Sequence, residues 1–274
     1  MELLSSPCFI VHLPKHTERV PVYQRIQDAG FQKIYWYPAV RGDQLPSVRQ
    51  AIARLQLGKL DPGISSGALG CLLSHLCLLQ HIIREEIPMA TIFEDDVMFH
   101  PEWSTLAPQY FEKMVEEYPG YEVVFIGNQL DSSRVFREPG PMLTQEPVYC
   151  THGYMVTLEG AKKLFRTLMA WDSTNTPYQG LTMIDYMIKE TQRRANVTKY
   201  FPFVWVSWDG TRHPCIHNHL PLTLEHCRNS GLVFQDTRLP TTVQGTGTVS
   251  LQPSILLTNR RRSIQKPLVF QRSV

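Results

Sequence analysis

The sequence predicts an α/β protein with a central, mostly parallel twisted sheet flanked by helices, and three observations support this class. Apolar runs of strand length alternate along the chain with segments of helical periodicity. The opening reads as a strand at 8–13, a helix at 20–29 and a strand at 33–40, a β-α-β unit that predicts parallel strands. A further apolar run ends in the acidic triplet Glu94-Asp95-Asp96, and such sheets place ligands at the carboxyl ends of their strands.

The remaining elements follow in order along the chain. Gly30 is placed to end the helix at 20–29, and a short helix is expected at 48–55. Leucines recur at three- and four-residue spacing from Ser66 onward, which predicts a long helix capped by Ser65 or Ser66. The run at 89–93 is apolar on both faces and follows a helix, so we expect a central parallel strand. Later strands are expected at 121–126, 148–157 and 199–206, and later helices at 158–171 and 177–194.

Composition sets the class of protein. The chain has 274 residues, 43% of them hydrophobic and 19% charged, which suits one large domain at 1–239 followed by an extended tail at 240–274 rich in Thr, Gly, Gln and Pro. A net charge of +2 argues against broad nucleic-acid binding. We expect no membrane span and no leader segment, and hence a cytoplasmic protein or one peripheral to a membrane. Six scattered cysteines without a CxxC pair fit reduced thiols in such a compartment.

The acidic triplet is the strongest chemical signal. Three adjacent anions at the end of a buried strand repel one another and lose solvation, so a positive group should sit beside them. A Mn²⁺ or Mg²⁺ ion is the simplest candidate, because hard cations take carboxylate oxygens and often bring substrate phosphates. Strand alternation places Glu94 and Asp96 on one side and Asp95 on the other. We expect Asp96 to contact the metal and Glu94 to be a second ligand or to accept a hydrogen bond from a ribose; an acidic turn without a ligand is the alternative.

A second cluster spans residues 208–219 and holds three histidines and a cysteine. Its spacing fits no standard zinc module. His217 or His219 could complete the coordination of the metal at the carboxylates, and a separate zinc hydrolase site is a further reading that predicts zinc in the purified protein. Incidental histidines in a loop are the alternative. His75, beside the apolar face of its helix, is by itself typical of a satisfied core histidine.

Residues 66–75 read SGALGCLLSH, and after about twenty residues the run Ile92-Phe93-Glu94-Asp95-Asp96 follows. This combination resembles glycosyltransferase family 25, which includes lipooligosaccharide and collagen galactosyltransferases. The opening strand with Arg19, the turn at 39–42 and the strand at 154–157 followed by Gly160-Ala161 agree with the resemblance, which covers about residues 7–190.

The resemblance implies a GT-A-like fold, a nucleotide-sugar donor that is UDP-linked, metal dependence and inversion at the anomeric carbon. Glu94 and Asp96 then take the metal. The positions assigned to the donor are His12, Leu13, Arg19, Ser74, His75, Glu94 and Asp95. His12 departs from the family pattern, which has Asn there.

The expected reaction is a single displacement in which a carboxylate deprotonates a hydroxyl of a glycan or glycoconjugate acceptor. Asp185 is the first choice of base and Asp209 the second. A different class remains open: a non-catalytic sugar- or nucleotide-binding module that keeps the fold, because fold alone does not guarantee activity.

Overall fold

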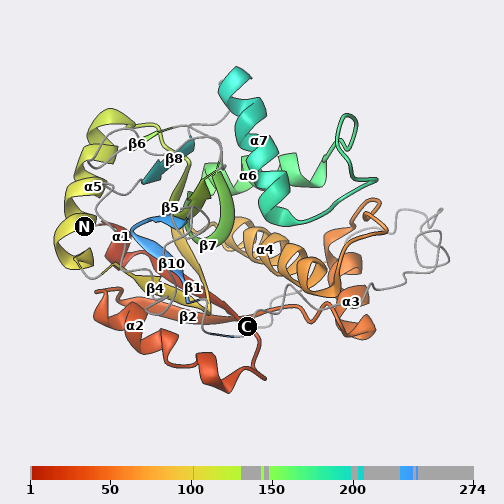
Figure 1. Ribbon diagram of the computed structural model, residues 1–274, viewed down its shortest axis with the longest axis horizontal. Coiled ribbons are helices and arrows are strands. Elements are labelled where there is room, and N and C mark those ends of the chain that lie inside the picture. Colours follow the sequence, from red (N-terminus) through yellow and green to blue (C-terminus); the bar gives the residue numbers. More distant parts are fainter. Residues whose placement is uncertain are drawn as a thin grey trace, which may run out of the picture.

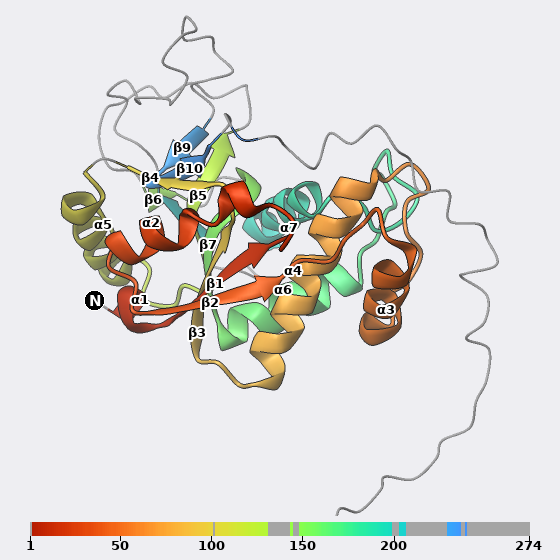
Figure 2. The same ribbon diagram turned by 90° about the horizontal axis from the view of Figure 1, so that it is seen from below.

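The computed structural model describes residues 2–100, 102–130, 143–144, 148–198, 203–206, 229–236 and 239. Its centre is a mixed sheet of eight strands in the order β2-β1-β3-β7-β5-β8-β6, with β9 paired to β5 (Figure 1). Helices cover both faces of this sheet, as the two perpendicular views show (Figures 1 and 2). The α/β class, with a central sheet flanked by helices, is therefore confirmed. The predicted boundary at 239 stays a prediction, because 240–274 lie outside the described residues.

The first half of the chain follows the expected order. It comprises α1 (Glu2–Ser5), β1 (Pro7–His12), the 3-10 turn η1 (Thr17–Arg19), α2 (Val22–Asp28), β2 (Lys33–Pro38), α3 (Leu45–Leu55), α4 (Ser66–Arg84) and β3 (Met89–Glu94). Strand β1 pairs in parallel with β2 on one side and with β3 on the other, which confirms the β-α-β opening. Gly30 follows α2 with a φ of +96°, a conformation that glycine adopts without strain.

Helix α4 is the central helix of one face. The Ser65 hydroxyl accepts a hydrogen bond from the Ala68 amide at 3.2 Å and so caps the helix as expected. With 19 residues it is long and apolar enough to cross a membrane, contrary to the expectation that no segment approaches that length. However, 67% of its apolar 18-residue stretch is buried inside the protein, as in the core helix of a globular domain.

The second half differs from the predicted order in several places. It comprises β4 (Val97–Phe99), α5 (Trp103–Glu117), β5 (Val123–Leu130), β6 (Leu143–Thr144), β7 (Val148–Thr157), α6 (Leu158–Met169), α7 (Ile184–Thr198), β8 (Phe203–Val206), β9 (Asn229–Gly231) and β10 (Val233–Gln235). Helix α5 and strands β4, β6, β9 and β10 were not predicted. Helix α7 begins at Ile184, later than the expected residue 177.

Strand β3 is parallel to only one of its two neighbours. It runs antiparallel to β7, which itself pairs antiparallel with β5, whereas β5 pairs in parallel with β8. The expectation of a central strand is thus confirmed, and its parallel pairing holds on the β1 side alone.

Alternation along the strands divides the core between the two faces of the sheet. In β3, Ala90 and Ile92 pack with α3, α4, α6 and α7, while Met89 and Phe93 pack with α1, α2 and α5. The same division places Phe9 and Ile10 of β1 on opposite faces. A strand buried on both faces reads as a continuous apolar run, which is why β3 was identifiable from its sequence. Because β3 ends at Glu94, the acidic triplet lies at one edge of the sheet.

Candidate functional site

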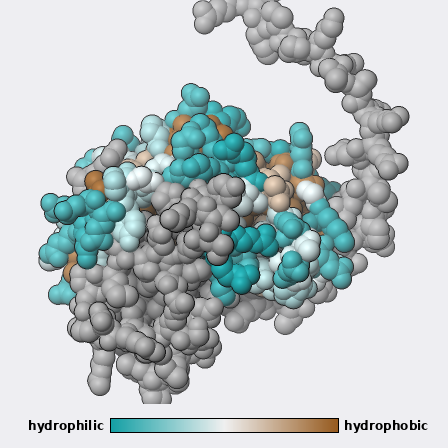
Figure 3. Space-filling model, turned by 90° about the horizontal axis from the view of Figure 1, so that it is seen from above, coloured by the Kyte–Doolittle hydropathy of each residue, from teal (hydrophilic) through white to brown (hydrophobic). Residues whose placement is uncertain are grey.

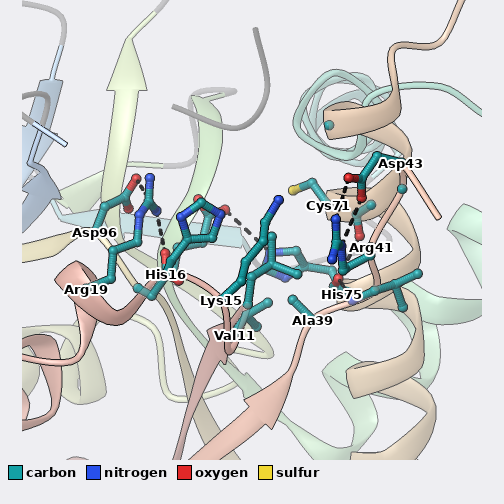
Figure 4. A pocket seen from close by; sticks show the side chains of 18 of the residues that line it. Val11, Lys15, His16, Arg19, Ala39, Arg41, Asp43, Cys71, His75 and Asp96 are labelled. Carbon is teal, nitrogen blue, oxygen red and sulfur yellow. Dashed lines mark hydrogen bonds and ion pairs between the residues drawn. The ribbon is translucent and has the colours of Figure 1, made fainter. Parts of the chain in front are cut away.

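A cavity of about 340 Å³ lies beyond the carboxyl ends of β1 and β3. Four segments line it: residues 13–19 after β1, the turn at 39–43, the first turns of α4, and the acidic triplet after β3. Figure 4 shows Arg19 and Asp96 at one side of this cavity, Arg41 and Asp43 at the other, and Lys15 and His16 between them. The position is the one that parallel strands predict for a ligand.

The three carboxylates of the triplet face different partners. Asp95 is 6% exposed and accepts hydrogen bonds from Arg19 and, at 2.8 Å, from Nδ1 of His12. Asp96 has one oxygen 3.5 Å from the same Arg19 guanidinium. Glu94 points instead toward His75 and Thr151. The triplet is therefore divided: Arg19 holds Asp95 and lies near Asp96, whereas Glu94 contacts His75 and Thr151.

Arg19 compensates only part of this charge. It is 5% exposed and supplies one positive charge against three carboxylates. Burial, with the charge of Glu94 second, raises the pKa of Asp96 to about 7, although Arg19 acts to lower it. The other oxygen of Asp96, Oδ1, is buried and has no hydrogen-bond partner among the residues that the structure describes. A carboxylate with a free buried oxygen and a raised pKa is suited to accept a cation.

Glu94 lies in a small buried network. The Thr151 hydroxyl donates to its Oε1 at 2.5 Å, and Nε2 of His75 lies 3.4 Å from the same oxygen. Nδ1 of His75 bonds the Tyr154 hydroxyl at 2.9 Å. Burial alone would raise the pKa of Glu94, but the His75 ring and the Thr151 hydroxyl outweigh burial and lower that pKa. Glu94 is therefore ionised at neutral pH, whereas its neighbour Asp96 is only partly ionised there.

The start of α4 and the turn at 39–42 form one rigid wall of the cavity. Ser74 donates to the Gly70 carbonyl at 2.6 Å and accepts from the Val40 amide at 2.8 Å. Gly42 lies so close to α4 that an added Cβ would stand 1.8 Å from the Ser66 carbonyl oxygen, and one on Gly70 would stand 2.7 Å from that of Val40. Only glycine fits such an approach of two backbones. Packing therefore explains Gly42 and, within the 66–75 motif, Gly70.

Basic side chains at the mouth of the cavity were not singled out from the sequence. Lys15, His16 and Arg41 line it, and Arg41 forms a two-pronged ion pair with Asp43 at 3.1 and 2.7 Å. Their position in the sequence could have indicated this role, because Lys15 and His16 directly follow the carboxyl end of a predicted strand. Gln235, from the unpredicted β10, also lines the cavity.

The predicted site residues do not all meet. Those lining the cavity are Leu13, Arg19, Ser74, His75, Glu94, Asp95 and Asp96. His12 is not among the lining residues, because its ring bonds Asp95 and packs on Trp36. Asp185, in the first turn of α7, is not among them either, yet Glu94 and His75 are near enough to affect its pKa, which burial raises. Asp209, His217 and His219 lie outside the described residues, so their predicted roles and the zinc hydrolase reading remain predictions.

Two sets of residues could hold a metal ion. Asp96 and Glu94 offer the carboxylate oxygens that Mn²⁺ and Mg²⁺ prefer, and the unpaired Asp96 Oδ1 fits such an ion. Within the described part of the chain, Cys71, His75 and Glu94 also present one donor atom each, all within 4.8 Å of one another. Cys71 was named in the motif but not proposed as a ligand.

The sequence of the chain is similar to that of a known protein family. Residues 6–188, more than half of the chain, match the sequence model of Glycosyltransferase family 25 (LPS biosynthesis protein). A Glycosyltransferase 25 family member of Anopheles gambiae is 27% identical over 180 residues, covering 60% of this chain and 29% of that protein. Human Procollagen galactosyltransferase 2 is 25% identical over 105 residues, 37% of this chain and 17% of that protein.

A bovine relative that is 24% identical over 104 residues, 37% of this chain and 18% of that protein, is named Probable inactive glycosyltransferase 25 family member 3. The chain therefore spans less than a third of the length of these curated relatives. The matched region contains β1, α4, β3 and the lining residues that these elements contribute. The chain belongs to glycosyltransferase family 25.

Proposed function

We propose that this chain is a metal-dependent inverting glycosyltransferase, which moves a sugar from a UDP-sugar donor to a hydroxyl of a glycan or glycoconjugate. One observation carries the proposal: Asp96, just after β3, lines a cavity of about 340 Å³, its charge is only partly compensated, and its buried Oδ1 has no hydrogen-bond partner among the described residues. Family membership and the galactosyltransferase name of the human relative support the reaction class and make galactose the first donor to test.

The residues of the cavity have separate roles in this proposal. Asp96 and Glu94 hold Mn²⁺ or Mg²⁺, which supplies positive charge to the diphosphate leaving group. Lys15, which lines the cavity, adds positive charge that attracts an anionic donor, whereas the charge of Arg41 is paired with that of Asp43. Arg19 forms an ion pair with Asp95 and fixes that side chain, so that the chain after β3 holds Asp96 in place. Ser74 fixes the turn at 39–42 on α4 and thereby shapes the pocket.

Asp185 is the proposed general base. It accepts a hydrogen bond from the Tyr186 amide at 3.0 Å, while burial raises its pKa. A carboxylate whose pKa is raised toward neutrality is a better proton acceptor than an ordinary one, provided that it remains ionised at the working pH. The acceptor hydroxyl would lose its proton to Asp185 and attack the anomeric carbon on the face opposite the diphosphate, which inverts the configuration.

A melting-temperature screen of nucleotide sugars with and without Mn²⁺ tests donor binding, because a ligand that binds only the folded protein raises its Tm. We expect a UDP-sugar with Mn²⁺ to raise the Tm of the full chain and not that of the Asp96→Ala variant. Asp28→Ala, at the exposed end of α2, is the matched control and should behave as the parent. An Asp96→Ala protein that binds and turns over donor like the parent would remove the metal role of Asp96.

Turnover is tested by release of UDP from the donor, with and without acceptor. Asp185→Asn should keep the Mn²⁺-dependent Tm increase and lose UDP release to an acceptor, and unchanged turnover would move the base elsewhere. The competing function, a non-catalytic binding module, is favoured by the bovine relative that is named probable inactive. It predicts donor binding without metal-stimulated hydrolysis of the donor in the parent protein.

A further inference from the structure

A second set of metal-binding atoms lies on the wall of the cavity. Cys71 and His75 stand one turn apart on the same face of α4, and Glu94 reaches them from the end of β3. The sulfur, the ring nitrogen and the carboxylate oxygen all lie within 4.8 Å of one another. Figure 4 shows the Cys71 sulfur turned toward the interior of the pocket.

His75 provides the independent sign of a ligand. Its side chain is fully buried, and Nε2 meets hydrogen-bond geometry with no described residue; it lies 3.4 Å from Oε1 of Glu94, the other candidate ligand. Its other nitrogen, Nδ1, is engaged by the Tyr154 hydroxyl at 2.9 Å. Metal-bound histidines characteristically have this arrangement, in which a hydrogen bond at one nitrogen orients the ring and the other nitrogen points to the ion.

The distances fit a tetrahedral centre. Two donors at bonds of about 2.1 Å from a tetrahedral zinc ion stand about 3.4 Å apart. The distance from His75 Nε2 to Glu94 Oε1 is 3.4 Å. Thr151, which donates to Glu94 Oε1, is a neutral partner that leaves the charge of the carboxylate in place. The sulfur of Cys71 lies within 4.8 Å of both other donor atoms and supplies the third ligand.

The surroundings of the sulfur are anionic. Burial first, and then the charges of Glu94 and Asp185, raise the pKa of the Cys71 thiol. Arg19, the cation nearest the triplet, is engaged by Asp95 and Asp96 on the other side. A divalent cation at Cys71 would therefore meet the negative charges of Glu94 and Asp185 and no competing charge from Arg19.

We propose that Cys71, His75 and Glu94 form a Zn²⁺ site with an open fourth position. A thiolate and an imidazole select zinc over Mn²⁺ and Mg²⁺, which prefer oxygen ligands. This site is chemically different from the carboxylate site at Asp96, although the two share Glu94. If the proposed transferase function holds, zinc takes Glu94 from the donor-metal complex and inhibits the enzyme.

Direct zinc binding tests the site without any assay of transfer. The full chain is stripped of metal and titrated with ZnCl₂ against a chromophoric zinc chelator. We expect Cys71→Ala to lower the affinity of the tightest site at least about 10-fold, since loss of even an orienting partner costs that much. Cys77→Ala, a buried thiol on the same helix, is the control and should bind zinc as the parent does. Equal zinc affinity in the Cys71→Ala and parent proteins would overturn the proposal.

Cobalt substitution identifies the sulfur as a ligand. Co²⁺ bound to a thiolate gives a charge-transfer absorption in the near ultraviolet, which we expect in the parent and in Cys77→Ala but not in Cys71→Ala. Its persistence in Cys71→Ala would place the thiolate elsewhere. Zinc inhibition of UDP release should then be weaker in Cys71→Ala than in the parent. A protein that binds zinc through Cys71 but shows no transfer would refute the proposed function and leave the zinc site standing.

Discussion

Replacing Asp96 with Asn should stabilise the unliganded protein at alkaline pH. Its pKa of about 7 in the folded state compares with 3.8 for an unperturbed aspartate. The difference, 7 minus 3.8, is 3.2 pKa units, which at about 1.36 kcal/mol per unit sets a ceiling near 4 kcal/mol. The side chain keeps 15% exposure, so solvent reduces this cost. We expect about 2 kcal/mol.

The direction in which stability changes with pH follows from proton binding. Between pH 4 and 7 the folded protein holds a proton on Asp96 that the unfolded chain has lost, so this group makes the folding free energy less favourable as pH rises through that window. Above pH 7 this loss of folding stability is complete and no longer changes with pH. Asn carries no such charge, so the Tm of Asp96→Asn minus that of the parent should be near zero at pH 4 and level off above pH 7.5.

The assay is a series of melting curves from pH 4 to 8.5 without divalent metal. A gain of about 2 kcal/mol corresponds to roughly 4–8 °C in a protein of this size. Asp28→Asn, outside the cavity, is the control and should give a difference that does not vary with pH. Added Mn²⁺ should then raise the Tm of the parent more than that of the variant. A variant that is less stable than the parent at pH 8 would refute the reasoning, because Asp96 would then be compensated in the unliganded protein.

Two further predictions concern Arg19 and Gly70, which line the same cavity as Asp96. Arg19→Met leaves Asp95 buried without its cation and should lower the free energy of unfolding by about 3–5 kcal/mol in urea denaturation at pH 7; Arg19→Lys should restore part of it, and equal loss in both would show that packing dominates. Gly70→Ala forces the Val40 carbonyl away from α4 and should cost about 1–3 kcal/mol and weaken donor binding, whereas Gly58→Ala, with open space around it, should do neither.

The parts of the fold that could be predicted are those set by local signals. Helix α4 combines a capping serine with an apolar face, and β3 is apolar on both faces, so each was recognisable by itself. Helix α5 was missed although Ala107, Tyr110, Phe111 and Met114 form its buried stripe, because Pro108 interrupts the pattern. The direction of β7 is a matter of pairing with β3 and β5, which no local pattern contains.

In the candidate site, too, some residues could be predicted from local sequence and others could not. The acidic triplet and the glycines of the 66–75 motif lie in continuous runs of sequence, and their resemblance to a family located them. The pairing of Arg19 with Asp95 joins residues 76 positions apart, and that of His75 with Tyr154 joins residues 79 apart. Such contacts depend on the packing of separate elements, so Tyr154 and Thr151 could not be assigned to the site from the sequence.

The pairing of Arg19 changes how the triplet itself is understood. From the sequence, three crowded anions called for a positive ion; the structure supplies one cation from the protein and gives it mainly to Asp95. Asp95 is thereby a structural residue that ties the end of β3 to the turn after β1. The need for external positive charge then falls mainly on Asp96, and Glu94 lines the same cavity. If the proposed function holds, two carboxylates and not three hold the metal, and an Asp95→Asn variant should lose stability before it loses metal affinity.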